Sequence, residues 1–340
     1  MRKTVLLYLI TVLSFSAARA QDNIGDLLKG SLKDANVLME GYVGPAMRGI
    51  GSGLNQGWYN TAKPHKTLGF DLTVNASLMY VPTGDEFYLV DNSKLTDISL
   101  IKYDNKSIDP ITGSANVPTI FGPDKSPTYK LRSGTSTEIT GPPGLDLGNT
   151  FKIANALPVP MYQLGIGLPK GFELKVRFAP TVKMQDYKFN LLGIGVMHDV
   201  GQYIPVVKAL PVDISAFVGY TKMTAEKDIS GTAAGQNQKG ILEFNSTTIQ
   251  ALVSKKISVL TIYGGVGYNI AKSNLAMKGT YDLDDNGSAE STDPVNLDFS
   301  TSGFRATGGL RLKLAVFTLH ADYTLAAYDA LTVGFGINVR

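Results

Sequence analysis

The stretch STSGFRATGGLRLKLAV, residues 300–316, alternates apolar and polar side chains with a period of two. Such alternation is typical of a β-strand with one apolar and one polar face. Segments 317–325 and 331–340 repeat the pattern directly after it, which predicts consecutive antiparallel strands at the end of the chain. In residues 300–316 the apolar face reads Phe304, Ala306, Gly308, Leu310, Leu312, Leu314 and Val316, and the polar face reads Thr301, Arg305, Thr307, Arg311 and Lys313.

The length of these segments favours a membrane barrel over a soluble sheet. A tilted strand needs about 9–11 residues to cross a bilayer, whereas soluble strands run to about 5–6 residues. The pattern gives ten clear or probable strands, and residues 82–158 leave room for more. We therefore predict an all-β fold, a transmembrane antiparallel β-barrel of about 12 strands, with 10–14 as the range. The other strands are expected at residues 68–80, 159–168, 172–178, 188–198, 212–221, 244–254 and 260–270.

The start of the chain has the features of an export signal. Arg2 and Lys3 precede an apolar run over residues 5–15, and Ala18-Arg19-Ala20 forms a small-x-small cleavage site. This predicts a signal peptide over residues 1–20.

The rest of the chain has no apolar run that approaches the roughly 20 residues of a spanning helix. A membrane location therefore requires a closed barrel, which we assign to residues 66–340. The expected location is the cell outer membrane, in contact with membrane lipids and the lipopolysaccharide of the outer leaflet.

Composition excludes several classes of function. The 340 residues include no cysteine, which excludes disulfides, thiolate metal sites, a cysteine nucleophile and a lipoprotein anchor. The net charge of +3 is too small to indicate a nucleic-acid partner. The 36 glycines, 16 tyrosines and 14 phenylalanines suit tight turns and interfacial aromatic girdles.

The connections between the expected strands differ in length. Residues 169–171 and 255–256 make short turns, whereas residues 82–127, 222–243 and 272–298 are long and polar. Outer-membrane barrels have short periplasmic turns and long extracellular loops. We therefore expect the three long segments to lie outside the cell.

Residues 21–65 do not follow the strand pattern. Apolar residues from Ile24 to Tyr42 recur with helical spacing, and a glycine-rich stretch with Pro45 then leads to Trp58 and Tyr59. Two placements fit: a plug or hatch folded into the barrel lumen, and a periplasmic helix against the rim. Trp58, the only tryptophan, could line a lumenal pocket in the first placement or anchor the chain at the interface in the second.

Two stretches carry a family resemblance. GLNQGWYNTAKPHKTLGFDL at 53–72 and MHDVGQYIPVVKALPVDISAFVGYTK at 197–222 resemble a family of uncharacterised outer-membrane barrels from Bacteroidetes-type bacteria. That family is similar in plan to the long-chain fatty-acid transporters, which implies an N-terminal hatch, a barrel and hydrophobic cargo. The chain has Gly44-Pro45-Ala46 in place of the transporters' Asn-Pro-Ala motif, and it ends in Arg340 rather than an aromatic residue.

The polar positions of the strands place charged side chains in the lumen. They would either tune selectivity or form a salt-bridged network that fills a narrow barrel. The inward basic set is Lys175, Arg177, Arg305, Arg311 and Lys313, and the inward acidic set is Asp71, Glu173 and Asp322. Our candidate ligand and lumen residues are Trp58, Tyr59, Arg177, Arg305, Arg311, His320 and Asp322.

Residues 282–287, DLDDNG, match the start of a calcium-binding loop. Asp282, Asp284 and Asn286 would supply ligands, and Asp293 stands where the pattern requires a bidentate glutamate. The flanking segments are strands rather than helices. We predict at most weak calcium binding, the alternative being a solvated acidic loop, and we expect no other cofactor.

No catalytic motif stands out, so we expect the protein not to be an enzyme. His320 and Asp322 project inward from one strand, which leaves a barrel hydrolase as a remote alternative. The leading hypothesis is that the barrel binds or passes small hydrophobic molecules across the outer membrane. The main rival is a structural or partner-binding barrel of an envelope or secretion assembly, without transport. The substrate and the oligomeric state do not follow from the sequence.

Overall fold

The computed structural model describes residues 27–28, 30–133, 138–148, 155–184, 187–205, 210–229, 236–282, 287–289 and 291–339. The expected signal peptide over residues 1–20, two of the expected calcium ligands, Asp284 and Asn286, and the terminal Arg340 lie outside these residues.

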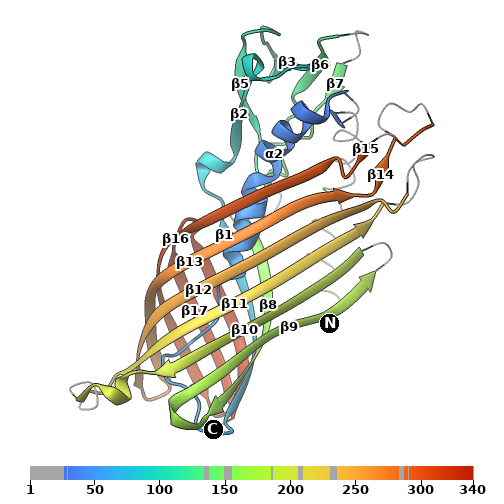
Figure 1. Ribbon diagram of the computed structural model, residues 1–340. Coiled ribbons are helices and arrows are strands. Elements are labelled where there is room, and N and C mark those ends of the chain that lie inside the picture. The colour runs from blue at the N-terminus through green and yellow to red at the C-terminus, as the bar shows by residue number, and fades with distance from the viewer. Residues whose placement is uncertain are drawn as a thin grey trace.

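Ten antiparallel strands close into a barrel in the order β1-β18-β17-β16-β13-β12-β11-β10-β9-β8 (Figure 1). The all-β barrel prediction is confirmed, but the expected number of about 12 strands is wrong. Both neighbours of β1 pair with it over most of its length, so the sheet closes on itself. The strands are β1 (Phe70–Tyr80), β8 (Ala156–Leu168), β9 (Phe172–Met184), β10 (Tyr187–Asp199), β11 (Asp213–Asp228), β12 (Lys239–Ile257), β13 (Leu260–Lys278), β16 (Val295–Leu314), β17 (Phe317–Leu325) and β18 (Ala330–Val339).

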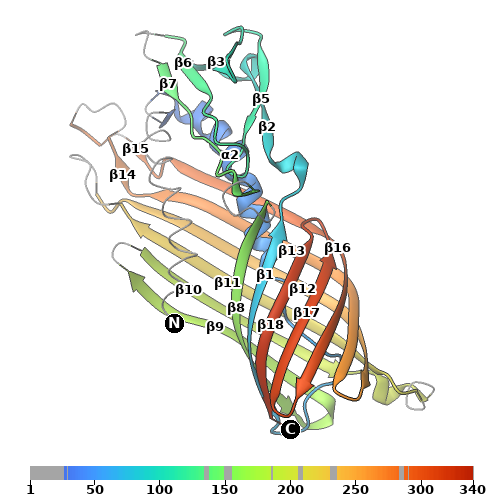
Figure 2. The same ribbon diagram turned by 180° about the vertical axis from the view of Figure 1, so that it is seen from behind.

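The extra strands expected between residues 82 and 158 belong to a separate structure, which we call the cap (residues 82–155). Its strands have only two to six residues, too few to cross a bilayer. They form one two-stranded and one four-stranded sheet beside the barrel mouth (Figure 2). The elements are η1 (Thr83–Asp85), β2 (Phe87–Asp91), η2 (Asn92–Lys94), β3 (Ile98–Tyr103), β4 (Lys106–Ser107), β5 (Ser114–Pro118), β6 (Thr128–Leu131) and β7 (Glu138–Thr140).

The barrel wall differs in height around its circumference. β11, β12, β13 and β16 have 16, 19, 19 and 20 residues, and we call them the tall wall. β17, β18 and β1 have only 9, 10 and 11 residues. Much of the segments 222–243 and 272–298, expected as loops, is therefore strand in the tall wall. The short hairpin of β14 (Thr280–Tyr281) and β15 (Ser291–Thr292) extends it further.

The two ends of the barrel carry different connections. β1 begins and β18 ends at the lower end in Figure 2, together with the turns η3 (Pro169–Gly171), η4 (Gly201–Tyr203) and residues 258–259 and 315–316. The cap and the described parts of the connections 229–238 and 279–294 lie at the upper end. The long connections, which we expect to lie outside the cell, therefore gather at the upper end.

The outer surface carries an apolar band. Every barrel strand contributes at least two exposed large apolar side chains, at alternate positions. None of the described helices is long and apolar enough to cross a membrane. The band includes Leu72 and Val74 of β1, Tyr162 and Leu168 of β8, Phe172 and Phe178 of β9, Leu192 and Ile194 of β10, Val218 and Tyr220 of β11, Ile249 and Val253 of β12, Ile262 and Val266 of β13, Phe304 and Leu310 of β16, Leu319 and Tyr323 of β17, and Val333 and Phe335 of β18.

Helix α2 (Leu32–Gly53) runs from the cap down into the lumen (Figure 1). The glycine-rich stretch, expected to follow the helix, is part of it. A Cβ at Gly51 would lie 3.0 Å from Cβ of Ala271, and one at Gly53 would lie 2.6 Å from the Val159 side chain. Glycine at these positions lets the helix approach the wall. Residues 54–65 then cross the lumen rather than lie against the rim.

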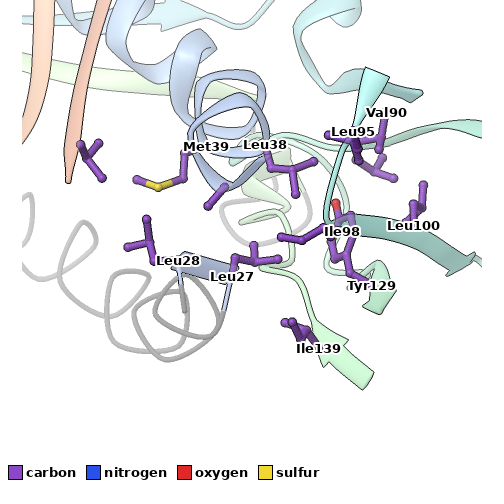
Figure 3. Packing of buried hydrophobic residues seen from close by; sticks show 13 residues of the cluster. Leu27, Leu28, Leu38, Met39, Val90, Leu95, Ile98, Leu100, Tyr129 and Ile139 are labelled. Carbon is purple, nitrogen blue, oxygen red and sulfur yellow. The ribbon is translucent and has the colours of Figure 1, made fainter. Parts of the chain in front are cut away.

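The upper half of α2 joins the cap to the tall wall. Leu38 and Met39 of the helix pack with Ile98 and Leu100 of the cap in one apolar cluster, and Val295 of β16 belongs to the same cluster (Figure 3). This shared core fixes the cap above the barrel, so the helix and the cap form one unit.

Asp34 attaches the cap to the first turn of α2. Its buried carboxylate accepts hydrogen bonds of 2.7–3.0 Å from the backbone N–H groups of Thr96, Asp97 and Ile98. Burial alone would raise the pKa of this carboxyl, but the three backbone donors outweigh it and hold the pKa below its ordinary value. The stabilisation is therefore present above the ordinary carboxyl pKa of about 3.9 and is lost as pH falls through the lower folded-state value.

We predict that Asp34→Asn loosens the cap at neutral pH, because three backbone donors lose a charged acceptor. A hydrogen bond to a charged group contributes about 1.5–3 kcal/mol, so the free energy of local opening should fall by at least that amount. Amide hydrogen exchange at residues 96–98 measures it. Asp91→Asn is the control, since Asp91 caps an exposed turn at Ser93. Unchanged exchange at 96–98 in Asp34→Asn would contradict the attachment.

Candidate functional site

The lumen has two layers along the barrel axis. In β1 the inward side chains are polar from Asp71 to Ser77 and then change to Met79. The inward side chains of β8, β12 and β16 make the same change towards the upper end. We call the apolar part the upper layer; its buried residues are Met47 and Leu54 of the helical segment with Met79, Val159, Met161, Leu191, Phe244 and Phe299 of the wall. We call the polar part beneath it the lower layer.

Two arginines of the lower layer bind the end of α2. Arg177 donates to the carbonyl oxygens of Leu54 (2.9 Å) and Gln56 (2.5 Å), and Arg305 donates to that of Asn55 (2.8 Å). Leu54 is the C-cap of α2, and Asn55 and Gln56 follow it, so these three carbonyls lie at the negative end of the helix dipole. Both guanidinium groups are buried, so they satisfy these carbonyls inside the lumen and hold residues 54–56 in place.

Trp58 lies against Arg177 and does not line an open pocket. The guanidinium carbon is 3.6 Å from the indole centroid, a cation–π contact, and Trp58 is 1% exposed. Tyr59 donates to Gln250 at 2.8 Å and packs edge-on against Tyr263. These aromatic residues therefore seal the lumen beneath the helix.

The lumen floor is an ionic cluster around His65. Its Nδ1 lies 2.9 Å from Glu173 and 3.7 Å from Asp71, and its backbone N–H also donates to Glu173. The three side chains could offer a metal ion ligand atoms within 4.8 Å of one another. Lys175, however, is bonded to Glu173, and Arg311 interacts electrostatically with both carboxylates. The cations already balance the two negative charges, so the arrangement fits a tether for the plug better than a metal site.

His320 and Asp322 both face the lumen, as expected, but they have different partners. Asp322 accepts a 2.8 Å hydrogen bond from Tyr263, and Nδ1 of His320 lies 3.5 Å from the amide nitrogen of Asn60. Within the described residues neither side chain is hydrogen-bonded to a serine. The pair therefore does not form the relay that a hydrolase would use, and the absence of enzymatic activity stays a prediction.

The expected calcium loop is only partly described. Asp282 accepts from the backbone N–H of Gly287 at 2.8 Å. Asp293 accepts from Gly279 and pairs with Lys278, both at 2.9 Å, so its two oxygens have other partners. A calcium ion would have to displace Lys278, and calcium binding stays a prediction.

The ladder between β8 and β9 is incomplete. The two strands pair only from Gln163–Arg177 down to Leu168–Phe172, and they diverge above (Figure 2). Residues 156–162 of β8 remain paired with β1 on their other edge, and residues 179–184 of β9 remain paired with β10. We call the unpaired edges, residues 156–162 and 178–184, the seam.

Prolines occupy both sides of the seam. Pro158 and Pro160 lie in the unpaired part of β8, and Pro180 lies in β9 where the β9–β10 register shifts. Proline has no backbone N–H and is confined to strand edges and bulges. The sequence thus disfavours completion of this ladder.

The seam borders the upper layer. Val159 and Met161 of β8 belong to the buried apolar cluster, and Leu157 and Ala179 pack against it. The unpaired stretch of β8 begins at Tyr162, which is an exposed residue of the outer band. At the seam, therefore, an apolar interior meets an apolar exterior. Among the described strands of the barrel, β8 and β9 are the one neighbouring pair that separates before either strand ends.

Sequence reasoning found the lumenal arginines but missed the upper layer and the seam. The signal for the upper layer was the appearance of Met79, Val159 and Met161 at inward positions. The signal for the seam was the Pro-Val-Pro stretch at 158–160.

The family comparison covers nearly the whole chain. A family model described as "Family of unknown function (DUF6588)" matches residues 1–339. A comparison with curated proteins found no match.

Solved structures with a similar fold are outer-membrane β-barrels. Ail, the attachment invasion locus protein of Yersinia pestis, is 7% identical with a TM-score of 0.23, over 80% of this chain and 96% of that one. The translocator domain of autotransporter NalP from Neisseria meningitidis is 13% identical with a TM-score of 0.24, over 93% and 99%. A Pseudomonas aeruginosa FadL homologue is 9% identical with a TM-score of 0.23, over 88% and 96%. At TM-scores this low the likeness carries no conclusion about this chain.

We predict that Arg177→Ala destabilises the plug, because it leaves the carbonyls of Leu54 and Gln56 without a donor. Each buried unpaired carbonyl costs about 1–3 kcal/mol. The variant should unfold at a lower temperature and conduct ions in planar bilayers, whereas the wild-type barrel should show no steady conductance. Arg48→Ala, at a partly exposed ion pair with Asp85, is the control. A closed and equally stable Arg177→Ala barrel would show that this arginine does not hold the plug.

Proposed function

The chain belongs to the family of unknown function DUF6588, and we propose that it is an outer-membrane barrel that binds small hydrophobic molecules in its upper layer and passes them sideways through the seam. The observation that carries this proposal is the incomplete β8–β9 ladder beside an apolar interior. A hydrophobic molecule could move between the upper layer and the outer leaflet there without breaking a ladder hydrogen bond between β8 and β9.

Three features support the outer membrane as the location. The start of the sequence has a signal-peptide pattern, the barrel wall is apolar on the outside along every strand, and the long connections gather at one end. The resemblance of residues 53–72 and 197–222 to Bacteroidetes-type barrels agrees with hydrophobic cargo.

The packed lower layer blocks passage of a molecule along the barrel axis unless the plug rearranges. Arg177, Arg305 and Trp58 are buried and bind or contact the segment after α2. A path to the lower end requires residues 54–65 to move. Sideways exchange at the seam would not require this path, because the seam lies above the Gln163–Arg177 pair.

The same packed lower layer favours a second candidate function, a structural or partner-binding barrel without transport. The cap would then be the binding element, since Leu89 and Ile111 expose 60% and 66% of their surface there. A barrel hydrolase is the weakest alternative, and lipid hydrolysis that is lost in His320→Ala would support it.

We predict that closing the seam abolishes exchange of hydrophobic molecules. The chain contains no cysteine, so an introduced pair is unique. If the β8–β9 ladder continued upward in the same register, Met161 would pair with Ala179. Met161→Cys with Ala179→Cys, joined by a short thiol-specific crosslinker, would therefore bridge the seam. Transfer of a fluorescent hydrophobic probe into proteoliposomes, measured before and after crosslinking, should fall to the rate of protein-free vesicles.

The control is Ala251→Cys with Val266→Cys, which face each other across the complete β12–β13 ladder. Crosslinking there should leave transfer unchanged. Full transfer through a crosslinked seam would refute the sideways path. Equal transfer in vesicles with and without wild-type protein would refute hydrophobic transport and favour the structural barrel.

A further inference from the structure

The outer face of the tall wall has a basic row at the upper border of the apolar band. Lys222, Asn245, Lys272 and Ser300 lie opposite one another across β11, β12, β13 and β16. Both lysines are exposed. The row nearer the upper end contains Glu243 and Asp298, so the lysine row lies between an acidic row and the band.

An apolar hollow lies directly below this row on the same face. It has a volume of about 670 Å³, and its lining includes Ile249, Val266, Tyr268, Phe304 and Leu325. Phe304 is 85% exposed because β17 ends at Leu325, beside Ala306, and does not cover it. The hollow opens on the outer face of the wall, which would contact lipid in the proposed outer-membrane location.

Tyrosines mark the height of the membrane surface here. Tyr220 donates to Asn245 of the lysine row at 2.7 Å, and Tyr268 is hydrogen-bonded to Ser302 at 3.3 Å. Amphipathic aromatic residues of this kind lie at the level of lipid headgroups. The ammonium groups of the lysine row are therefore at headgroup height, and the hollow is at acyl-chain height.

The two lysines differ from the other outward lysines in the upper part of this wall and the adjoining β10. Lys188, Lys239 and Lys278 form ion pairs with Glu226, Asp228 and Asp293 at 3.1, 3.9 and 2.9 Å. Across the described ranges, no carboxylate lies within 4.0 Å of Lys222 or Lys272. Their charge is available to an anion from outside the chain.

We infer that this face binds one phosphorylated lipid of the outer leaflet, with its phosphate between Lys222 and Lys272 and an acyl chain in the hollow. The lysines are two strands apart, about 10 Å between Cα atoms, so their long side chains can converge on one phosphate. The hollow supplies apolar contact, and the lysines supply the charge that distinguishes a phosphorylated lipid from a neutral one. This inference rests on the outer-membrane location proposed above.

Native mass spectrometry of the detergent-purified barrel tests the inference with three probes: lipid A, lipid A after phosphatase treatment, and phosphatidylcholine. Lipid A should form a one-to-one adduct that the other two do not form at equal concentration. Lys222→Gln with Lys272→Gln should weaken that adduct roughly tenfold or more, since each lysine near an anionic surface contributes about 1 kcal/mol. Lys239→Gln with Lys278→Gln, two lysines of the same wall that have acidic partners, should leave it unchanged.

A second variant tests the hollow. Ala306→Trp fills it from the outward face of β16 and should weaken the lipid A adduct, whereas Ala321→Trp on the outward face of β17 is the control. The inference would be overturned if all three lipid probes bound equally, or if both double lysine variants lost the lipid A adduct to the same extent. It would also be overturned if a second copy of the chain, rather than lipid, occupied this face. A barrel that enters lipid nanodiscs without selecting lipid A refutes this inference alone. A barrel that cannot enter nanodiscs refutes the proposed location as well.

Discussion

Backbone hydrogen bonding in apolar surroundings is the constraint on which the rest of this structure depends. Closure of ten strands gives the wall its partners, because β1 pairs with both β8 and β18. Regular pairing ends at the turn after α2 and at the seam. Arg177 and Arg305 solve the first by donating to the free carbonyls. Proline solves part of the second, because Pro158 and Pro160 have no N–H that needs an acceptor.

The same constraint explains why the lower lumen contains buried arginines. A guanidinium group loses hydration on burial, and only good hydrogen bonds or an opposite charge compensate for that loss. Among the described residues no carboxylate lies within 4.0 Å of the Arg177 guanidinium; its partners are two main-chain carbonyls, the side-chain oxygen of Gln163 and the face of Trp58. These carbonyls at and just beyond the C-cap of α2 thus take the place of an acidic residue, which couples the position of α2 to the wall.

Period-two alternation was sufficient to predict the barrel, because the outward positions of β16, β17 and β18 within the apolar band carry apolar side chains. It could not predict the number of strands. Apolar residues such as Ile98 and Leu100 serve the core of the cap as well as they would serve a membrane strand. A cap strand differs from a membrane strand in its length and in the strand with which it pairs. The pairing partner depends on the whole fold and cannot be deduced from one segment.

The candidate site was predictable only in part, for a related reason. Arg177 and Arg305 lie at inward positions of predicted strands, so their presence in the lumen followed from the pattern. Their partners did not, because the carbonyls of residues 54–56 are acceptors in every sequence. The glycines of α2 were equally ambiguous. A glycine-rich stretch indicates a loop unless a wall residue such as Ala271 lies close enough to require it.

The relative cost of two paths favours sideways movement over passage along the barrel axis. An axial path must break the three hydrogen bonds from Arg177 and Arg305 to the carbonyls of residues 54–56. At about 1.5–3 kcal/mol for a bond to a charged group, their loss costs ~5–9 kcal/mol before any side chain moves. A path through the seam breaks no ladder bond between β8 and β9, because none forms above the Gln163–Arg177 pair. The plug and the seam are therefore compatible with the proposed function, because sideways exchange would leave the closed lower end intact.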